Sequence, residues 1–288
     1  MKVKLGSFLL ASLLVLSFNA VVFSQDMNLE NMVLPPDYSA MPQEQATTQA
    51  TTNLDEVIDP LLDLFGFYTG GGLYHTADIH GLGGFDIGVR LVTMVVKDDQ
   101  KPDLPFPENT EYQYDGGIFR DVSFMPLPLL QASVGLPGNL EATGRFFTYP
   151  MGEGEKQGNI TLIGVGLKYG IIQNMLLPRV AITAAYHYLS VPDEFDFGKV
   201  SSFSGALLAS KDFAFIEIYG GVGIDYNKLE VDLMLPDPIG NVTKDYTKQN
   251  MRYNLGLKIK PFPLLFIHAD YNFGDVQGFN AGLGVSFR

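Results

Sequence analysis

Apolar and polar positions alternate with a period of two along most of the chain. The alternating runs lie at 85–92, 163–169, 180–188, 251–259, 265–273 and 279–287. In most runs the residues between the apolar positions are mainly polar, charged or glycine, and in 180–188 they are alanine, threonine and histidine. Alternation of this kind predicts β-strands with one apolar face. The longer runs exceed the about five to six residues of a typical soluble strand and fit the roughly 9–11 residues of a tilted membrane-spanning strand.

The face opposite the apolar one distinguishes a membrane barrel from a soluble β-sandwich or lipocalin-like barrel. In a soluble fold the apolar face points inward, whereas in a membrane barrel it points to lipid. Small and charged residues on the second face suit a crowded polar lumen, because glycine lets opposite walls approach each other. We therefore expect an all-β fold, a transmembrane antiparallel β-barrel. The charged residues expected to face its lumen are Asp86, Arg90, Glu141, Arg145, Lys168, Glu217, Arg252, Lys258 and Asp270.

The expected barrel has about 12 strands. Eleven candidate strands can be placed from Phe65 onward. Because bacterial single-chain barrels have an even number of strands, about 10–14 are expected. Aromatic residues gather at strand ends, where the interfacial girdles of a membrane barrel lie: Tyr169, Tyr186, Tyr188, Tyr226, Tyr271 and Phe287. Tight connections are expected at 137–138, 173–174, 261–263 and 275, and long polar ones at 97–116, 191–198 and 233–246. This division is typical of short periplasmic turns and long outer loops.

Residues 1–24 have the composition of a cleavable export signal. Lys2 and Lys4 precede a mainly apolar stretch, and small residues suit cleavage after Ser24. The alternative is an N-terminal membrane anchor, which the shortness of the stretch and its polar flank disfavour. Residues 25–53 contain acids, a Pro-Pro pair and a threonine-rich tract but no base. Such composition buries little apolar surface, so we expect a disordered acidic linker there.

Residues 54–64 are expected to form a short amphipathic helix before a barrel that occupies 65–288. Apolar residues recur at helical spacing, Asn53 is a candidate N-cap and Pro60 predicts a short or kinked helix. The segment is either a periplasmic tether or a plug in the lumen. As a plug, its acids would meet basic lumen residues, Arg252 and Lys258 among them. Its apolar stripe would then need an apolar lining near the periplasmic mouth.

The last strand resembles the C-terminal β-signal that is read by the outer-membrane barrel-assembly machinery. The signal positions are Asn280, Gly282, Val285 and Phe287, and Arg288 departs from the usual aromatic ending. Physically, an amphipathic edge strand can pair with another sheet edge during insertion. The resemblance implies the assembly machinery as a partner and the outer membrane of a Gram-negative bacterium as the location.

Two stretches also resemble a known family. The first runs from Gly72 through Ala77 to Asp86, and the second comprises 132–137 with Glu141, Arg145-Phe146 and 164–169. They are similar to an uncharacterised family of outer-membrane β-barrel proteins of Bacteroidetes-type bacteria, over roughly residues 65–190. An N-terminal segment followed by a barrel also loosely resembles the long-chain fatty-acid transporter class. The family resemblance implies fold and location, and it lends no site residues.

Composition narrows the chemistry further. The 288 residues include 19 Lys and Arg against 32 Asp and Glu, with no Cys. An acidic chain lacks the basic face that nucleic acid requires, and disulfides or cysteine–zinc sites are impossible. His75 and His80 are expected to be exposed loop residues rather than metal ligands, and His187 and His268 to lie on the polar face.

No catalytic residue or cofactor is expected. A lipid-modifying enzyme would need a serine and a histidine held together on the lipid side of the wall, and no Gly-x-Ser-x-Gly motif occurs. The sequence favours a pore or transporter for small or hydrophobic molecules, whose partners are membrane lipid and a small hydrophobic ligand. The alternative is a structural or adhesive barrel with a filled lumen and partner-binding outer loops.

Overall fold

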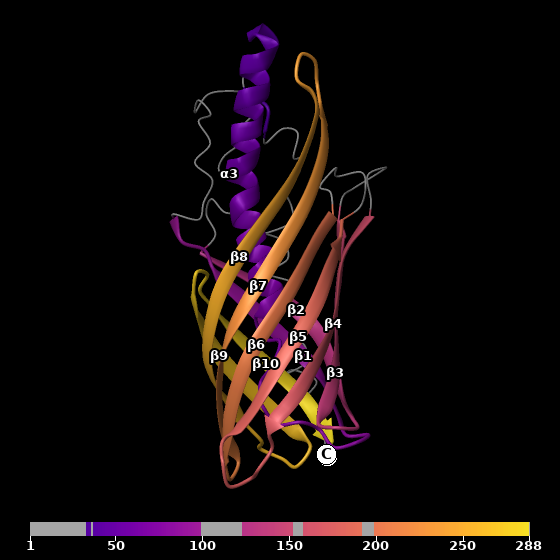
Figure 1. Cartoon of the computed structure of the whole chain (residues 1–288), viewed down its shortest axis with the longest axis vertical. Coiled ribbons are helices and arrows are strands. Elements are labelled where there is room, and N and C mark those ends of the chain that lie inside the picture. The colour runs from indigo at the N-terminus through magenta and orange to yellow at the C-terminus, as the bar shows by residue number, and fades with distance from the viewer. Residues whose placement is uncertain (1–32, 36, 99–122, 152–157, 192–198, 288) are drawn as a thin grey trace, which may run out of the picture.

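The computed structural model describes residues 33–35, 37–98, 123–151, 158–191 and 199–287. In these residues ten β-strands form a closed barrel in which neighbours in the chain pair antiparallel. The first strand closes the ring by pairing with the last, from Phe85 opposite Phe287 to Met94 opposite Gly278. One long helix enters the barrel from one end and continues down its interior (Figure 1). The predicted fold class is confirmed.

The elements follow one another along the chain in a simple order. The helical ones are η1 (Tyr38–Ala40) and α3 (Gln43–Gly70). The strands are β1 (Phe85–Val95), β2 (Phe124–Leu136), β3 (Leu140–Met151), β4 (Gly158–Ile172), β5 (Arg179–Ser190), β6 (Lys199–Phe213), β7 (Ile216–Leu235), β8 (Gly240–Ile259), β9 (Leu265–Gly274) and β10 (Gly278–Phe287).

An apolar belt covers the outside of the barrel. Along β8, for example, Leu255 and Leu257 are 63% and 50% exposed, while the residues between and beside them are buried. A continuous apolar surface of this extent is unfavourable in water and is the face that a membrane barrel turns to lipid. The aromatic residues predicted to form girdles are all exposed on it: Tyr169, Tyr186, Tyr188, Tyr226, Tyr271 and Phe287.

The barrel is smaller than the expected 12 strands, because residues 65–84 do not begin it. Residues 65–70 complete α3, and β1 starts only at Phe85. Most residues from 71 to 80 are buried inside the barrel, where their polar groups bond to side chains of the wall. This segment therefore fills the lumen rather than adding a strand. The alternation predicted from Phe65 onward was wrong for these twenty positions.

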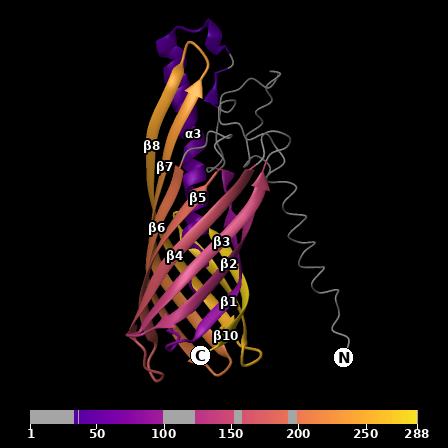
Figure 2. The same ribbon diagram turned by 90° about the vertical axis from the view of Figure 1, so that its right-hand side faces the viewer.

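The β7–β8 hairpin extends well beyond the other strands (Figures 1 and 2). Both of its strands have 20 residues. Along β7 the buried side chains change from polar at Asp225 and Asn227 to apolar at Leu229 and Val231. The outward side chains change in the opposite sense, from Ile224 and Tyr226 to residues such as Glu230. The inversion marks where the hairpin leaves the lipid, since its outer face then meets water and its inner face covers α3.

The long polar loop predicted at 233–246 is instead the end of this hairpin. Leu235 pairs with Gly240, so the chain reverses within a few residues. The alternation is harder to recognise there because the polar face of β8 points outward and its inner face also contains lysine and tyrosine.

α3 is much longer than the predicted helix. It has 28 residues, so residues 43–53 are helical rather than a disordered linker. Asn53 is an interior residue rather than the N-cap, and its side-chain amide donates to the Val33 carbonyl at 3.0 Å. Pro60 lies inside the helix without ending it. The hairpin provides apolar partners for the helix, and this packing outweighs the local penalty of the proline. No helix in the described ranges is long and apolar enough to cross a membrane.

Candidate functional site

The interior of the barrel is the candidate site, and the chain itself occupies it. We call the end from which the hairpin projects the upper end, and the end where β1 begins and β10 finishes the lower end. All nine charged residues predicted to face the lumen are buried, with exposed fractions of 6% or less. They do not form one cluster. Arg145 and Arg252 lie near the end of α3, whereas the others surround the segment that follows it.

The upper lumen is apolar and is filled by the C-terminal part of α3, whereas the N-terminal half of the helix packs on the projecting hairpin above it (Figure 1). Ala46, Ala50, Leu54 and Ile58 are completely buried in this apolar cluster. The wall residues that pack there are Val92, Met94, Met125, Leu127, Leu129, Leu162, Val200, Leu229, Val231, Leu233 and Leu235. The apolar lining that a plug was expected to need is present, and it lies at the upper end, where α3 enters the barrel.

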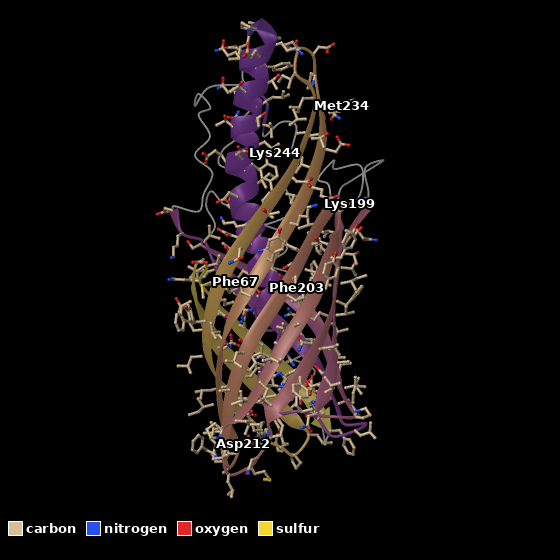
Figure 3. The ribbon with its side chains drawn as sticks, in the orientation of Figure 1. Phe67, Lys199, Phe203, Asp212, Met234 and Lys244 are labelled. Atoms are coloured by element: carbon tan, nitrogen blue, oxygen red, sulfur yellow. The ribbon has the colours of Figure 1, made fainter. Side chains whose placement is uncertain are left out.

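Acidic residues on one face of α3 pair with the inner face of β8. Asp55 lies 2.5 Å from Lys244, and Asp59 lies 2.6 Å from Lys248. Asp63 lies 3.0 Å from Lys248 and accepts a hydrogen bond from the Asn250 side chain at 2.9 Å. Figure 3 shows Lys244 beside the helix, on the projecting part of the hairpin.

These partners differ from those predicted. The acids of the helix meet Lys244 and Lys248 rather than Arg252 and Lys258, which have partners of their own deeper in the barrel. Burial alone would lower the pKa of Lys248, but its hydrogen bonds to Asp59 and Asp63 and their charges raise that pKa above its ordinary value. Two sequence patterns could have predicted this pairing. The acids of the helix recur every four residues, which places them on one face, and the two lysines are four positions apart, which places them on one face of a strand.

Arg145 and Arg252 surround the point where α3 ends. Arg252 donates to both oxygens of Asp225, at 3.0 and 3.3 Å. Arg145 donates to the carbonyl oxygens of Thr69 and Gly71, at 2.7 and 2.8 Å. These bonds satisfy carbonyls that the end of a helix leaves without partners. Gly70 leaves room for this pair, because a Cβ atom there would force the side chains of Asp225 and Arg252 to shift.

The lower lumen is filled by residues 71–80 and is polar. Glu141 is the centre of one network, with Lys168 at 2.7 Å from Oε1 and the His80 imidazole at 2.6 Å from Oε2. The backbone N–H of His80 also donates to Oε2 of Glu141 at 3.1 Å. On the other side Thr76 donates to Glu217, and the Tyr74 hydroxyl donates to Asn254 at 2.7 Å. The segment is thus bonded to several strands at once.

A stack of rings lies beside this network. The imidazole of His75 stacks on Phe266, with ring centroids 4.6 Å apart and planes at 8°. The guanidinium of Arg90 and the ammonium of Lys258 lie 5.1 and 5.0 Å from the centre of the same ring. Asp86 and Glu217 are the nearby acids, at 3.6 Å from Arg90 and 3.7 Å from Lys258. Opposite charges therefore lie next to each other on the inner wall, on one strand for Asp86 and Arg90 and on paired strands for Glu217 and Lys258.

The predicted exposure was wrong for two of the four histidines. His75 and His80 were expected to be exposed, but they are 3% and 1% exposed, because the segment that carries them runs inside the barrel. His187 and His268 are buried on the inner face, as predicted. Within the described residues no group of three or more His, Asp or Glu side chains is arranged to hold a metal ion.

The predicted assembly-signal residues all lie on β10. Asn280 is buried and its side chain donates to Asp270 at 2.7 Å, whereas Val285 and Phe287 are exposed on the lipid face. Gly282 allows His268 and Arg90 to pass close to the wall. The ring of Phe287 lies 6.0 Å from that of Phe85 on the strand that closes the barrel.

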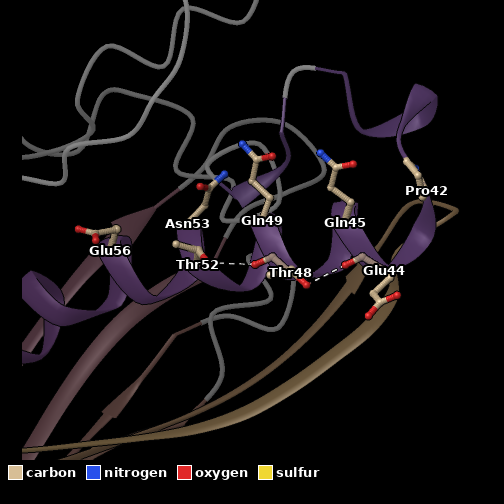
Figure 4. Close-up of a pocket in the computed structure, with 8 residues that line it drawn as sticks. All are labelled: Pro42, Glu44, Gln45, Thr48, Gln49, Thr52, Asn53 and Glu56. Carbon is tan, nitrogen blue, oxygen red and sulfur yellow. Dashed lines mark hydrogen bonds between the residues drawn. The ribbon is translucent and has the colours of Figure 1, made fainter.

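An open groove of about 690 Å³ follows one face of the N-terminal half of α3 (Figure 4). Most of the residues that line it are of polar type: Pro42, Glu44, Gln45, Thr48, Gln49, Thr52, Asn53 and Glu56. This face is opposite the apolar one that packs on the hairpin. The helix is therefore amphipathic, although its apolar partner is part of the same chain.

Residues 102–287 match the model of a family of unknown function, DUF6588. The chain belongs to this family. The matched range includes strands β2 to β10, whereas α3 and β1 precede it. The family description assigns no activity, in line with the resemblance noted from the sequence. A comparison with curated proteins finds no match.

Several solved structures are weakly similar to this chain. The N-terminal β-barrel domain of OprF from Pseudomonas aeruginosa is 15% identical, with a TM-score of 0.31, and the match covers 52% of this chain and 96% of that one. Ail of Yersinia pestis, solved with the heparin analogue sucrose octasulfate, is 14% identical with a TM-score of 0.29, over 73% of this chain and 99% of that one. OmpT of Vibrio cholerae, an outer membrane protein, is 13% identical with a TM-score of 0.29, over 71% and 76%.

Proposed function

We propose that this family member is a closed outer-membrane barrel with a structural or partner-binding role, rather than an open pore. The observation that carries the proposal is the filled lumen, in which α3 occupies the upper half and residues 71–80 occupy the lower half. The part available for a partner is the stalk, which we define as residues 43–58 of α3 with residues 228–248 of the hairpin.

Apolar packing and buried polar bonds favour a closed interior. Burial of Leu54, Ile58 and Leu62 stabilises the inserted helix by about 1.5–3 kcal/mol for each side chain. In the lower lumen, withdrawal of the segment would break the hydrogen bonds that it makes to Glu141, Glu217 and Asn254, each of which contributes on the order of 0.5–3 kcal/mol. The half-exposed ion pairs on the stalk contribute only about 0–1 kcal/mol each. Apolar packing and buried polar bonds therefore dominate.

Conductance in a planar bilayer tests the closed state directly. We expect the purified full-length protein to insert without producing stable single-channel steps. Insertion is checked independently by migration on SDS gels, where a folded barrel runs faster before heating than after it. Stable steps from full-length protein that has passed this control would contradict the proposal.

An outer-membrane location is part of the proposal and is supported by the apolar belt and by the terminal strand. The expected partners are membrane lipid around the belt and the barrel-assembly machinery during insertion. Cell fractionation tests this part. Recovery of the protein in the soluble periplasm would exclude the membrane location.

A gated pore or transporter is the second candidate. The observation in its favour is that the inner wall carries charges of both signs, which would line a polar passage if the chain left the lumen. The loose resemblance to fatty-acid transporters also favours this candidate. Its expected ligand is a small hydrophobic molecule. Deletion of residues 25–64 would leave the lower lumen filled, whereas deletion of residues 25–80 would empty it. A gated pore predicts conductance from the second variant and solute-dependent conductance from the intact protein, while the closed barrel predicts conductance from the second variant alone.

We also propose that the protein is not an enzyme. All four histidines are buried inside the barrel, away from the lipid face where a membrane-lipid hydrolase would need one. An assay for phospholipase activity with folded protein in detergent tests this statement, and turnover above that of a His187→Ala control would overturn it.

A further inference from the structure

The segment from α3 to residue 80 passes through the barrel in one direction. Its contacts with β8 progress steadily from the tip of the hairpin downward. Asp55 bonds to Lys244, Asp63 bonds to Asn250, and Tyr74 bonds to Asn254. His80 then bonds to Ser286, next to the end of the last strand. The segment therefore enters at the upper end and leaves at the lower end.

The two ends of the barrel differ in their connections. At the lower end lie both ends of the sheet, Phe85 and Phe287, and the turns 137–139, 173–178, 214–215 and 260–264. At the upper end β7 and β8 form the projecting hairpin, and 28 residues separate the upper ends of β1 and β2, many more than in any of these turns. The tight connection expected at 275 also lies at the upper end, as the turn 275–277, so, contrary to the prediction, it does not group with the lower turns. Figure 3 labels Met234 near the tip of the hairpin and Asp212 at the opposite end. In outer-membrane barrels short turns face the periplasm and long loops face the exterior.

We propose that the chain is threaded through its own barrel, so that the N-terminal half of α3 lies on the cell surface together with the hairpin. The inference rests on the proposed outer-membrane location and goes beyond it. An exported chain reaches the outer membrane from the periplasm, yet Gln43 lies at the exterior end and Phe85 at the periplasmic end. Residues 43–80 therefore cross the membrane inside the barrel, with α3 shielded from lipid by the wall.

The pairing of α3 with the hairpin explains how a polar helix reaches the exterior. On β7, the inward residues beyond the belt are apolar, at Leu229, Val231, Leu233 and Leu235. They cover Ala46, Ala50 and Leu54, which are completely buried. Among the described residues, Val33, Leu34, Tyr38 and Met41 add to the same apolar cluster. The helix and the hairpin consequently form one unit on the same side, and we expect them to cross together during assembly.

Cysteine labelling can test the threading cleanly because the chain contains no cysteine. Three single variants report on three places: Glu44→Cys on the first turn of α3, Asn241→Cys at the hairpin tip, and Met175→Cys in a lower turn. Glu44 and Asn241 are exposed, and Met175 is 81% exposed. Each is treated in intact cells with a membrane-impermeant maleimide, and again after the outer membrane has been permeabilised.

We expect Glu44→Cys and Asn241→Cys to be labelled in intact cells, and Met175→Cys to be labelled at least tenfold more after permeabilisation. Labelling of Asn241→Cys without Glu44→Cys would overturn the threading while leaving the orientation intact. Labelling of Met175→Cys alone would overturn both. Absence of all three signals in intact cells, with protein found in the periplasmic fraction, would instead show that the proposed location is wrong.

Discussion

The ammonium of Lys248 on β8 lies 3.0 Å from the carboxylate of Asp63 on α3. The side chain of Asp63 is 10% exposed and that of Asp55, farther out along the helix, is 49% exposed. The ion pairs of Asp63 and Asp55 both connect α3 to β8, but solvent screens the pair of Asp55 more strongly. The deeper pair is expected to contribute more to the attachment of α3.

Asp63→Ala should lower the free energy of unfolding by on the order of 1–3 kcal/mol, because it removes charge-assisted hydrogen bonds from Lys248 and Asn250. Asp55→Ala should lower it by less than about 1 kcal/mol. The temperature at which the fast-migrating folded form disappears from SDS gels measures the difference. Equal decreases in this temperature for the two variants would show that the contribution of an ion pair does not depend on how deeply it is buried.

The attachment should also weaken at alkaline pH. Because the folded-state pKa of Lys248 is raised, the contribution of its ion pairs is fully present below the ordinary value of about 10.4 and is lost as pH rises through the higher folded value. Thermal stability of the natural protein should therefore fall above a pH of about 10.4 more steeply than that of Lys248→Met. Parallel profiles would contradict the raised pKa.

Glu141 and Lys168 provide a test of the lower lumen. Glu141→Ala leaves the 5% exposed Lys168 without its carboxylate, and breaking such a buried pair costs about 3–5 kcal/mol. The double variant Glu141→Gln with Lys168→Met removes both charges and keeps the volume similar, so it should recover much of the loss. Denaturant unfolding of the folded barrels measures all variants. If the double variant is less stable than Glu141→Ala, the pair is not the source of the effect.

Substitutions at Phe287 and Phe213 allow the assembly signal to be compared with an ordinary lipid-facing position. They are 55% and 56% exposed, so an aspartate at either site meets a similar degree of exposure. A charge near the membrane interface costs about 0–1 kcal/mol, much less than at the midplane. Phe287→Asp should nevertheless reduce insertion several-fold and Phe213→Asp only slightly, as measured by the amount of heat-modifiable protein in outer membranes. Similar losses would indicate that the terminal strand is not recognised.

The sequence by itself determined the barrel and the orientation of its wall residues. Alternation with a period of two is a local property of the extended backbone, so Leu255 and Leu257 could be assigned to the lipid face and Lys258 to the interior without any knowledge of the partner strands. The same local rule failed in the projecting part of the hairpin, where the outer face of the strands meets water and the inner face is apolar. Along β7 the inner residues become apolar at Leu229, and only the presence of α3 there makes that arrangement stable.

Only the tertiary structure decided what fills the lumen and how long the helix is. Asp55 and Lys244 are separated by 189 positions, and no local pattern relates residues at such a distance. Residues 43–53 look like a linker because their polar composition outweighs two small apolar residues, Ala46 and Ala50. Those alanines are buried against the hairpin, and that contact makes the segment helical. Secondary structure with a repeating pattern is thus encoded locally, whereas a helix stabilised by long-range packing is determined by its partner.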